Sequence, residues 1–235
     1  MSVNYHAAQS RGILLDHSDA GADQWYQKFC KYDPARVAGL LGLKYDDKYL
    51  YVDYYQRPYR LSLAFGTLER WEKQEGKEEQ RGKEKEKREE KQENGGWSRE
   101  IYFNEAMAIY HLLLYVKDEA RVSGSWVASD SVDGVVSRGR MPDPLLAPFA
   151  VEYSGKLAEL EEACLHCGGM RLDKGDVSFE FEAFPQVHLQ LVFYDADEDF
   201  PAQASILVDQ HITDYLHYET IGCLISDLLD RIRAN

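Results

Sequence analysis

The sequence predicts an α+β fold in which an antiparallel sheet is packed against helices on one face. Two observations predict the sheet: residues 176–184 and 187–195 each alternate apolar and polar side chains, and only a short turn at Pro185 separates them. A third observation predicts the helical layer, because residues 218–235 repeat apolar side chains every three to four positions. Alternating strands joined by a short turn are typical of an antiparallel sheet with one face in water.

The core of this predicted unit can be named residue by residue. A third strand is expected at residues 205–209, where the run SILVD follows Pro201, a residue that interrupts a strand. The period of two on strands and of 3.6 on helices decides which side chains share a face. The side chains expected to face the core are Val177, Phe179, Phe181, Val187, Leu189, Leu191 and Phe193 on the strands and Ile221, Leu224, Ile225 and Leu228 on the helix.

The first part of the chain is predicted to hold two helices and a hairpin. Residues 22–32 place aromatic side chains on one helical face, and a second helix is expected to begin at Asp33 and to end at Gly42. Aromatic and β-branched residues then alternate with polar ones. This pattern predicts a β-hairpin with strands at residues 48–55 and 59–65.

Two further helices are predicted in the middle of the chain. Residues 98–120 carry an apolar stripe after a capping serine, and residues 155–167 form an amphipathic helix that ends at a double glycine. A turn into a strand is expected at residues 123–132. Residues 133–152 carry glycine, proline and mixed charge, and we expect an irregular connection there.

Residues 69–96 form a charged low-complexity segment within what is otherwise predicted to be a single domain spanning residues 1–235. Residues 69–93 hold ten acids and nine bases, and no apolar side chain lies between Trp71 and Trp97. Such a segment cannot bury enough surface to offset the loss of chain entropy. We expect it to be an insertion or linker, either disordered or a solvated helix.

The charge of the chain bounds its partners. The net charge is −14, and between Gly175 and Asp230 there are twelve Asp or Glu residues and no Lys or Arg. Affinity for nucleic acids and anionic membranes comes mainly from cationic contacts, so we expect neither partner. A protein or a cationic ligand at the acidic face is compatible with this charge. The absence of a signal-peptide pattern and of long apolar runs favours a cytoplasmic protein.

Cys164 and Cys167 form a C-x-x-C motif at the predicted end of a helix. A redox pair needs its first cysteine at a helix N-terminus, where the helix dipole lowers the thiol pKa, whereas a C-terminus has the opposite effect. A structural zinc site needs four ligands, and only Cys30 and Cys223 could complete one. A partly exposed pair in a helix cap is therefore favoured over a metal or redox site.

The densest set of candidate ligands comprises Asp209, His211, Asp214, His217 and Glu219. Carboxylate and imidazole groups at this spacing could bind a divalent ion if the loop folds back on itself. They could equally bond the strand end and cap the first turn of the last helix. No nucleophile elbow, Walker loop, G-x-G-x-x-G turn or H-E-x-x-H helix is visible. We therefore expect no cofactor and assign no catalytic residue.

The C-terminal third follows the pattern of an F-P-x-x-A-x-I-L-x-D strand, a Y-L-x-x-E turn and a final helix. By this motif most of the chain, except residues 69–96, resembles a prokaryotic domain-of-unknown-function family common in anaerobic bacteria and archaea. The matching residues are Phe200, Pro201, Ala204, Ile206, Leu207, Asp209, Tyr215, Leu216 and Glu219, with Ser123, Gly124 and Trp126 for a preceding S-G-x-W segment. The chain departs from the family at Tyr218 and Thr220, where members carry Thr and Asp, and it lacks the cysteine-rich segment of some relatives.

The sequence leaves two hypotheses of function open. The first is a non-enzymatic cytoplasmic binding or accessory protein that uses the acidic C-terminal sheet-helix unit. The resemblance implies the second, because some relatives occur beside iron–sulfur or corrinoid proteins of anaerobic one-carbon metabolism. This alternative is a metal-dependent or redox enzyme built on Asp209, His211, His217 and the cysteines.

Overall fold

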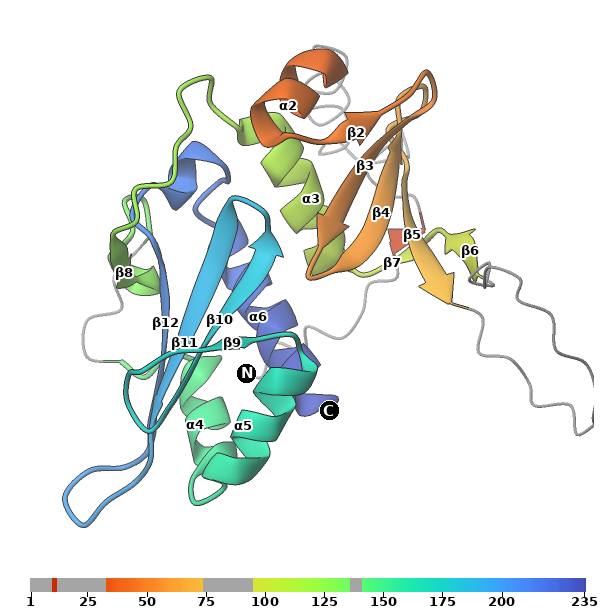
Figure 1. The fold of residues 1–235 in the computed structure, drawn as a ribbon. Coiled ribbons are helices and arrows are strands. Elements are labelled where there is room, and N and C mark those ends of the chain that lie inside the picture. Colours follow the sequence, from red (N-terminus) through yellow and green to blue (C-terminus); the bar gives the residue numbers. More distant parts are fainter. Residues whose placement is uncertain (1–9, 12–32, 74–94, 136–140) are drawn as a thin grey trace, which may run out of the picture.

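The computed structural model describes residues 10–11, 33–73, 95–135 and 141–235 of the chain. These residues form two five-stranded antiparallel sheets, a two-stranded sheet and five helices (Figure 1). The predicted α+β class is therefore confirmed. The sequence predicted one sheet, however, and the structure has two of similar size. The predicted helix at residues 22–32 lies outside the described residues.

The first sheet is built around the predicted hairpin. Its strand order is β2 (Lys44–Tyr45), β3 (Tyr49–Tyr54), β4 (Arg57–Ser62), β5 (Leu68–Lys73) and β6 (Gly95–Ser98). It follows α2 (Pro34–Leu41), which begins and ends as predicted. The Asp33 carboxylate accepts hydrogen bonds from the first-turn amides, and Gly42 adopts the left-handed conformation that ends a helix.

The predicted insertion at residues 69–96 includes residues at both ends that belong to strands β5 and β6. Strands β5 and β6 pair with each other, and the rings of Trp71 and Trp97 lie opposite at 5.3 Å between centroids. The charged residues of β5 escaped the sequence pattern because they are buried in pairs: both Arg60 and Arg99 donate to the Glu69 carboxylate. Residues 74–94, the remainder of the predicted insertion, lie outside the described residues.

The second sheet contains the three strands predicted from alternation. Its order is β8 (Trp126–Ala128), β12 (Gln203–Asp209), β11 (Val187–Tyr194), β10 (Val177–Phe184) and β9 (Met170–Arg171). Every side chain predicted to face the core is buried. The opposite face is not fully wet, because the loop before β10 crosses it: Lys174 donates to Ser178 and Gln190, and both of these side chains are buried.

Four helices follow the first sheet in the chain: α3 (Phe103–Tyr115), α4 (Leu146–Tyr153), α5 (Leu157–His166) and α6 (Thr220–Arg233). Helices α4, α5 and α6 cover the apolar face of the second sheet, and α3 packs against α6 and the first sheet (Figure 1). Among the described residues, no helix combines the length and the apolar character needed to cross a bilayer.

Two helix predictions need correction. The predicted helix at residues 98–120 begins only at Phe103, because Ser98 belongs to β6, and it ends at Tyr115. Helix α4 lies in the stretch predicted to be irregular. Pro148 is tolerated there because it is in the first helical turn, where its missing N–H has no intrahelical acceptor. The Asp143 carboxylate accepts the amides of Leu145 and Leu146 and so supports this helix start.

The two sheets meet at the tip of the β3–β4 hairpin. The amide of Tyr55 donates to the carbonyl of Ala183 in β10, at 3.0 Å, and the Tyr55 hydroxyl donates to the carbonyl of Leu224 in α6, at 2.9 Å. Buried side chains of both sheets and of α3 and α6 form one continuous hydrophobic cluster. The tip of one sheet is therefore held in the helical layer of the other.

Candidate functional site

Asp209, the first of the predicted ligands, is used by the backbone. Its carboxylate accepts hydrogen bonds from the amides of Ser123, Gly124 and His211, at 2.8 to 3.1 Å. Burial alone would raise the pKa of Asp209, but these hydrogen bonds hold it below its ordinary value. The residue therefore joins the S-G-x-W segment to the end of β12, which links the two sequence motifs by geometry.

The remaining predicted ligands lie in two other places. The Nδ1 atom of His211 is 3.9 Å from the Asp214 carboxylate, which also binds Lys117 at 2.9 Å. The Nδ1 atom of His217 is 3.4 Å from the carboxylate of the exposed Glu219. The imidazole of His217 lies among three rings, those of His111, Tyr115 and Tyr218.

The structure thus divides the five predicted residues among three separate contacts. Among the described residues, no three His, Cys, Asp or Glu side chains are grouped so that they could hold a metal ion. Asp209 also has its carboxylate occupied by N–H donors, which compete with a cation for the same oxygens. Asp209 thus bonds the backbone at the strand end, as one alternative of the sequence analysis expected, whereas Glu219 lies at the start of α6 without a side-chain cap hydrogen bond.

Cys164 and Cys167 lie at the end of α5 as predicted, but the pair is not partly exposed as expected, because Cys164 is fully buried. Cys30 lies outside the described residues. Cys164 is buried within the helix, Cys167 follows its last turn, and both are free thiols, as is Cys223 on α6. Burial raises the pKa of Cys164 to about 12 and that of Cys223 to about 11, and it also raises the pKa of Cys167. These thiols are therefore protonated at neutral pH, which makes them weak nucleophiles and weak metal ligands.

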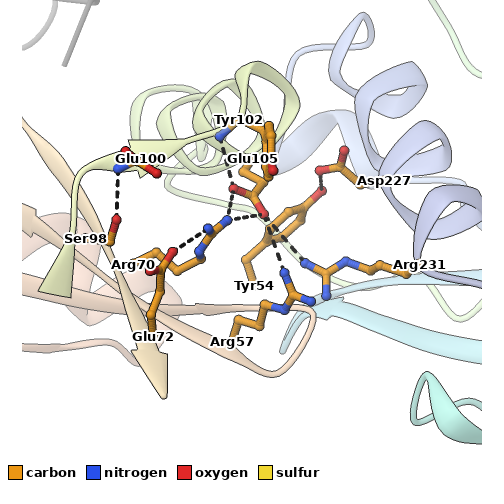
Figure 2. Close-up of polar contacts among 10 residues, drawn as sticks. All are labelled: Tyr54, Arg57, Arg70, Glu72, Ser98, Glu100, Tyr102, Glu105, Asp227 and Arg231. Carbon is orange, nitrogen blue, oxygen red and sulfur yellow. Dashed lines mark hydrogen bonds and ion pairs between the residues drawn. The ribbon is translucent and has the colours of Figure 1, made fainter. Parts of the chain in front are cut away.

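A different group of polar side chains converges where the two sheets meet. We call it the seam cluster and define it as Arg57, Arg70, Glu105, Asp227 and Arg231. Figure 2 shows the three guanidinium groups directed at the Glu105 carboxylate from three different elements, with Asp227 on the neighbouring helix. Arg57 begins β4, Arg70 lies on β5, Glu105 is in the first turn of α3, and the other two lie on α6.

Glu105 is the centre of the seam cluster. It is only 4% exposed, and its carboxylate accepts two hydrogen bonds from Arg70, at 2.8 and 3.1 Å. It also accepts the amide of Tyr102, which forms a capping box at the start of α3. Arg57 and Arg231 each approach the same carboxylate oxygen at 4.0 Å, which is too long for a hydrogen bond.

Asp227 supplies the second carboxyl group of the cluster. It accepts a hydrogen bond from the Tyr54 hydroxyl at 2.8 Å. Burial raises the pKa of Asp227 to about 6, against the opposing effect of hydrogen bonds from Tyr54 and Asn104. This carboxyl group therefore changes its charge close to neutral pH, which is a property found more often at functional sites than elsewhere.

The hairpin tip that carries Arg57 is strained. Tyr55 and Gln56 have positive φ angles of 45° and 60°, which non-glycine residues adopt at a cost of about 1–2 kcal/mol each. The tip fits closely against the end of α5: a Cβ atom at Gly168 would lie 2.4 Å from the side-chain amide of Gln56. Contacts on three sides therefore hold the turn in its unfavourable conformation, and the turn fixes where β4 and Arg57 begin.

The cluster has hydrogen-bonding capacity that the described residues do not use. Neither Arg57 nor Arg231 donates a side-chain hydrogen bond to any described residue. The Arg231 guanidinium lies over the Tyr55 ring, 4.9 Å from its centroid. The hydroxyl of Tyr59, a fully buried residue beside Glu105, also lacks a hydrogen-bond partner in the described part of the chain.

Sequence reasoning did not identify the seam cluster. Its members are far apart in the chain, Arg70 lies in the stretch taken for an insertion, and Glu105 lies within an apolar helix stripe. One signal was present: Arg231 is the first basic residue after the long base-free stretch that ends at Asp230.

Comparison with known protein families places most of the chain in a family. A family model described as "Domain of unknown function (DUF3786)" matches residues 33–231, which includes both sheets and all members of the seam cluster. No curated protein and no solved structure matches the chain.

Proposed function

The chain belongs to this family of domains of unknown function, and from the geometry of the seam cluster we propose that it is a non-enzymatic binding or accessory protein that holds a ligand there. We place it in the cytoplasm, in agreement with its free thiols. The acidic C-terminal unit contributes to this site through α6, which carries both Asp227 and Arg231.

One observation carries this proposal: a buried group of charges occupies a position that apolar residues could fill. Replacing buried ion pairs by apolar side chains is often neutral or stabilising, so enclosing the Glu105 carboxylate and the Arg70 guanidinium, which are 4% and 12% exposed, brings no clear gain in stability. The strained hairpin tip beside them adds a further cost. Strain and buried charge that coincide at one place support a binding role.

Binding is favoured over catalysis because the cluster lacks an activated nucleophile among the described residues. The nearest thiols, Cys167 and Cys223, have raised pKa values, since burial disfavours the thiolate. Asp227 could accept or donate a proton near neutral pH. No described group beside it is placed to attack a substrate.

The proposal is tested with protein purified without a His-tag. We expect elemental analysis to find no stoichiometric metal, and we expect at least one probe among phosphate, succinate, divalent cations and a lysine-rich peptide to raise the melting temperature. A ligand that binds only the folded state stabilises it by about 2.7 kcal/mol when the ligand concentration is a hundred times the Kd. Stoichiometric zinc, iron or cobalt would instead support the metal-dependent or redox alternative. A melting temperature that ignores every probe would contradict a binding role.

A second candidate partner surface is favoured by the loop between β11 and β12. Phe200 is 63% exposed there and is flanked by the exposed carboxylates of Asp197, Glu198 and Asp199. An apolar side chain with an acidic rim fits a basic, partly apolar segment of a partner protein. Binding of a lysine-rich amphipathic peptide should then weaken with salt and with Phe200→Ser. Equal binding by both proteins would contradict this candidate.

A further inference from the structure

We infer that Arg57 and Arg231 form a receptor for a small oxyanion, a carboxylate or a phosphate, at the open side of the seam cluster. This inference rests on the proposed function and specifies its ligand.

The use of donors differs sharply among the three arginines. Arg70 donates to both Glu105 and Glu72, at 2.7 to 3.1 Å. A guanidinium group has five N–H donors. Arg57 and Arg231 use none of them in side-chain hydrogen bonds to described residues, although both reach the same oxygen of Glu105 at 4.0 Å.

The charges of the cluster leave the same two arginines short of partners. Arg70 is the closest partner of Glu105 and also binds Glu72. Asp227 is hydrogen-bonded to Tyr54 and is partly protonated near neutral pH, because burial raises its pKa to about 6. Two guanidinium groups that share one oxygen repel each other, and an anion between them removes that repulsion.

The two guanidinium groups are presented in a way that suits a planar or tetrahedral oxyanion. Arg231 is 16% exposed and lies over the Tyr55 ring, so the ring covers one face of its guanidinium group and leaves the N–H donors in the plane without a described hydrogen-bond acceptor. Arg57 is 53% exposed and forms the solvent side of the cluster. Two arginine forks side by side bind carboxylate or phosphate oxygens through charge-assisted hydrogen bonds.

A buried hydroxyl group adds a neutral donor at the base of the cluster. Tyr59 lies opposite Arg70 in the β4–β5 pairing and two residues from Arg57, so the three side chains share one face of the sheet. Its hydroxyl is buried next to Glu105 and Arg70 and makes no hydrogen bond of full geometry with a described residue. A ligand oxygen, or the water it brings, would give this hydroxyl an acceptor.

The overall charge limits the size of the ligand. The chain has a net charge of −14, so an extended polyanion would be repelled by the surrounding surface. A small anion needs only the two arginines. Both a carboxylate and a phosphate have this chemistry, and the experiment below separates them.

The experiment measures binding of inorganic phosphate and of succinate by calorimetry, with sodium chloride at equal ionic strength as the reference. The variant is Arg57→Gln, chosen because this side chain is half exposed and makes no hydrogen bond that folding requires. The matched control is Arg99→Gln, an arginine that is 70% exposed and pairs with Glu69 in the first sheet, away from the seam cluster. Circular dichroism verifies that each variant is folded.

We expect the unmodified protein and Arg99→Gln to bind one of the two anions with equal affinity, and Arg57→Gln to bind it about tenfold or more weakly. Arg57→Lys should have an intermediate affinity, because it keeps the charge and loses the fork. Phosphate alone or succinate alone as the bound anion identifies the source of the oxyanion.

Two outcomes overturn the inference. One is an affinity that Arg57→Gln leaves unchanged, which would place the anion elsewhere. The other is no binding of either anion beyond the chloride reference. If in that case a divalent cation or the lysine-rich peptide still raises the melting temperature, the binding function stands and only the oxyanion is wrong. If no probe acts, both proposals fail.

Discussion

Asp209 and Glu105 are both buried carboxylates, yet Asp209 bonds nearby backbone amides and Glu105 mainly binds side chains from distant parts of the chain. Asp209 accepts amides from a neighbouring turn and from its own strand end, within one sheet. The Glu105 carboxylate accepts hydrogen bonds from Arg70 on the first sheet, and two further arginines, Arg57 and Arg231, lie 4.0 Å from it. The carboxylates and imidazoles that lie close together in the sequence therefore make mostly local contacts, whereas the seam cluster is formed by residues that are far apart in the chain.

The largest effect is expected for Glu105→Ala. Removing one partner of a buried charge network leaves the others uncompensated, so the free energy of unfolding should fall by about 3–5 kcal/mol. Arg70 in particular would lose its closest partner while it is only 12% exposed. Urea denaturation measures this loss. The control is Glu72→Ala, whose half-exposed ion pair with the same arginine is worth about 1 kcal/mol or less. Equal losses in the two variants would argue against a central role for Glu105.

A smaller loss is expected for Asp209→Asn, which keeps the shape and removes the charge. Hydrogen bonds to a charged acceptor contribute about 1.5–3 kcal/mol, and Asn retains only one acceptor oxygen. We expect a loss of about 2 kcal/mol with anion binding at the seam cluster unchanged. A variant that kept its stability but lost a bound metal would restore the metal hypothesis for this residue.

The same residue predicts a pH dependence. The pKa of Asp209 is lowered in the folded state, so its stabilisation is present above the unfolded pKa of about 3.9 and is lost as the pH falls through the lower folded value. Acid denaturation of Asp209→Asn should therefore begin from a lower plateau and show a weaker dependence on pH in this range. Parallel curves for the two proteins would contradict this assignment.

Asp227 should have the opposite sign. Its pKa is raised to about 6, because burial favours the neutral form. The folded state then binds a proton that the unfolded state has released, so stability falls as the pH rises from about 4 to 6. Asp227→Asn removes this fall, with a change of roughly 2–3 kcal/mol. Denaturation curves at pH 4, 5, 6 and 7 measure the difference, and curves with the same slope in both proteins would contradict it.

No loss of stability is expected from shortening the charged segment. Lys73 and Gly95 are paired across β5 and β6, so residues 74–94 can be replaced by a two-residue Asn-Gly turn. No apolar side chain is removed, and closing a much shorter loop costs less chain entropy. The free energy of unfolding should therefore stay the same or rise by up to about 2 kcal/mol. A loss would show that these residues contribute to packing, against the insertion hypothesis.

The strength of the local pattern decided how much could be predicted. Strands β10 and β11 were correct because strict alternation leaves one way to bury Phe179 and Leu191, and α2 was correct because Asp33 and Gly42 mark both of its ends. Strand β5 was missed because its buried charges, such as Glu69, find their partners on other strands. Composition alone cannot distinguish a buried ion pair from a solvated charge.

The candidate site was beyond prediction for a related reason. The contact between Arg231 and Glu105 joins residues that only the packing of α6 against α3 brings together. Burial, which raises the pKa of Asp227, is likewise a property of the assembled fold. The sequence showed the acidic stretch clearly, but the arginine that follows it gained its meaning only from the structure.

The glycine that receives the hairpin tip has a consequence for tolerance to substitution. A Cβ atom at Gly168 would meet only the end of the exposed Gln56 side chain, which can turn away while both sheets keep their ladders of hydrogen bonds. The φ of 76° at Gly168 still disfavours an L side chain, so Gly168→Ala should lower the free energy of unfolding by about 1–2 kcal/mol and leave ligand affinity unchanged. What this position contributes is a left-handed backbone at the end of α5, and a melting curve measured beside a binding curve separates that contribution from any effect on the site.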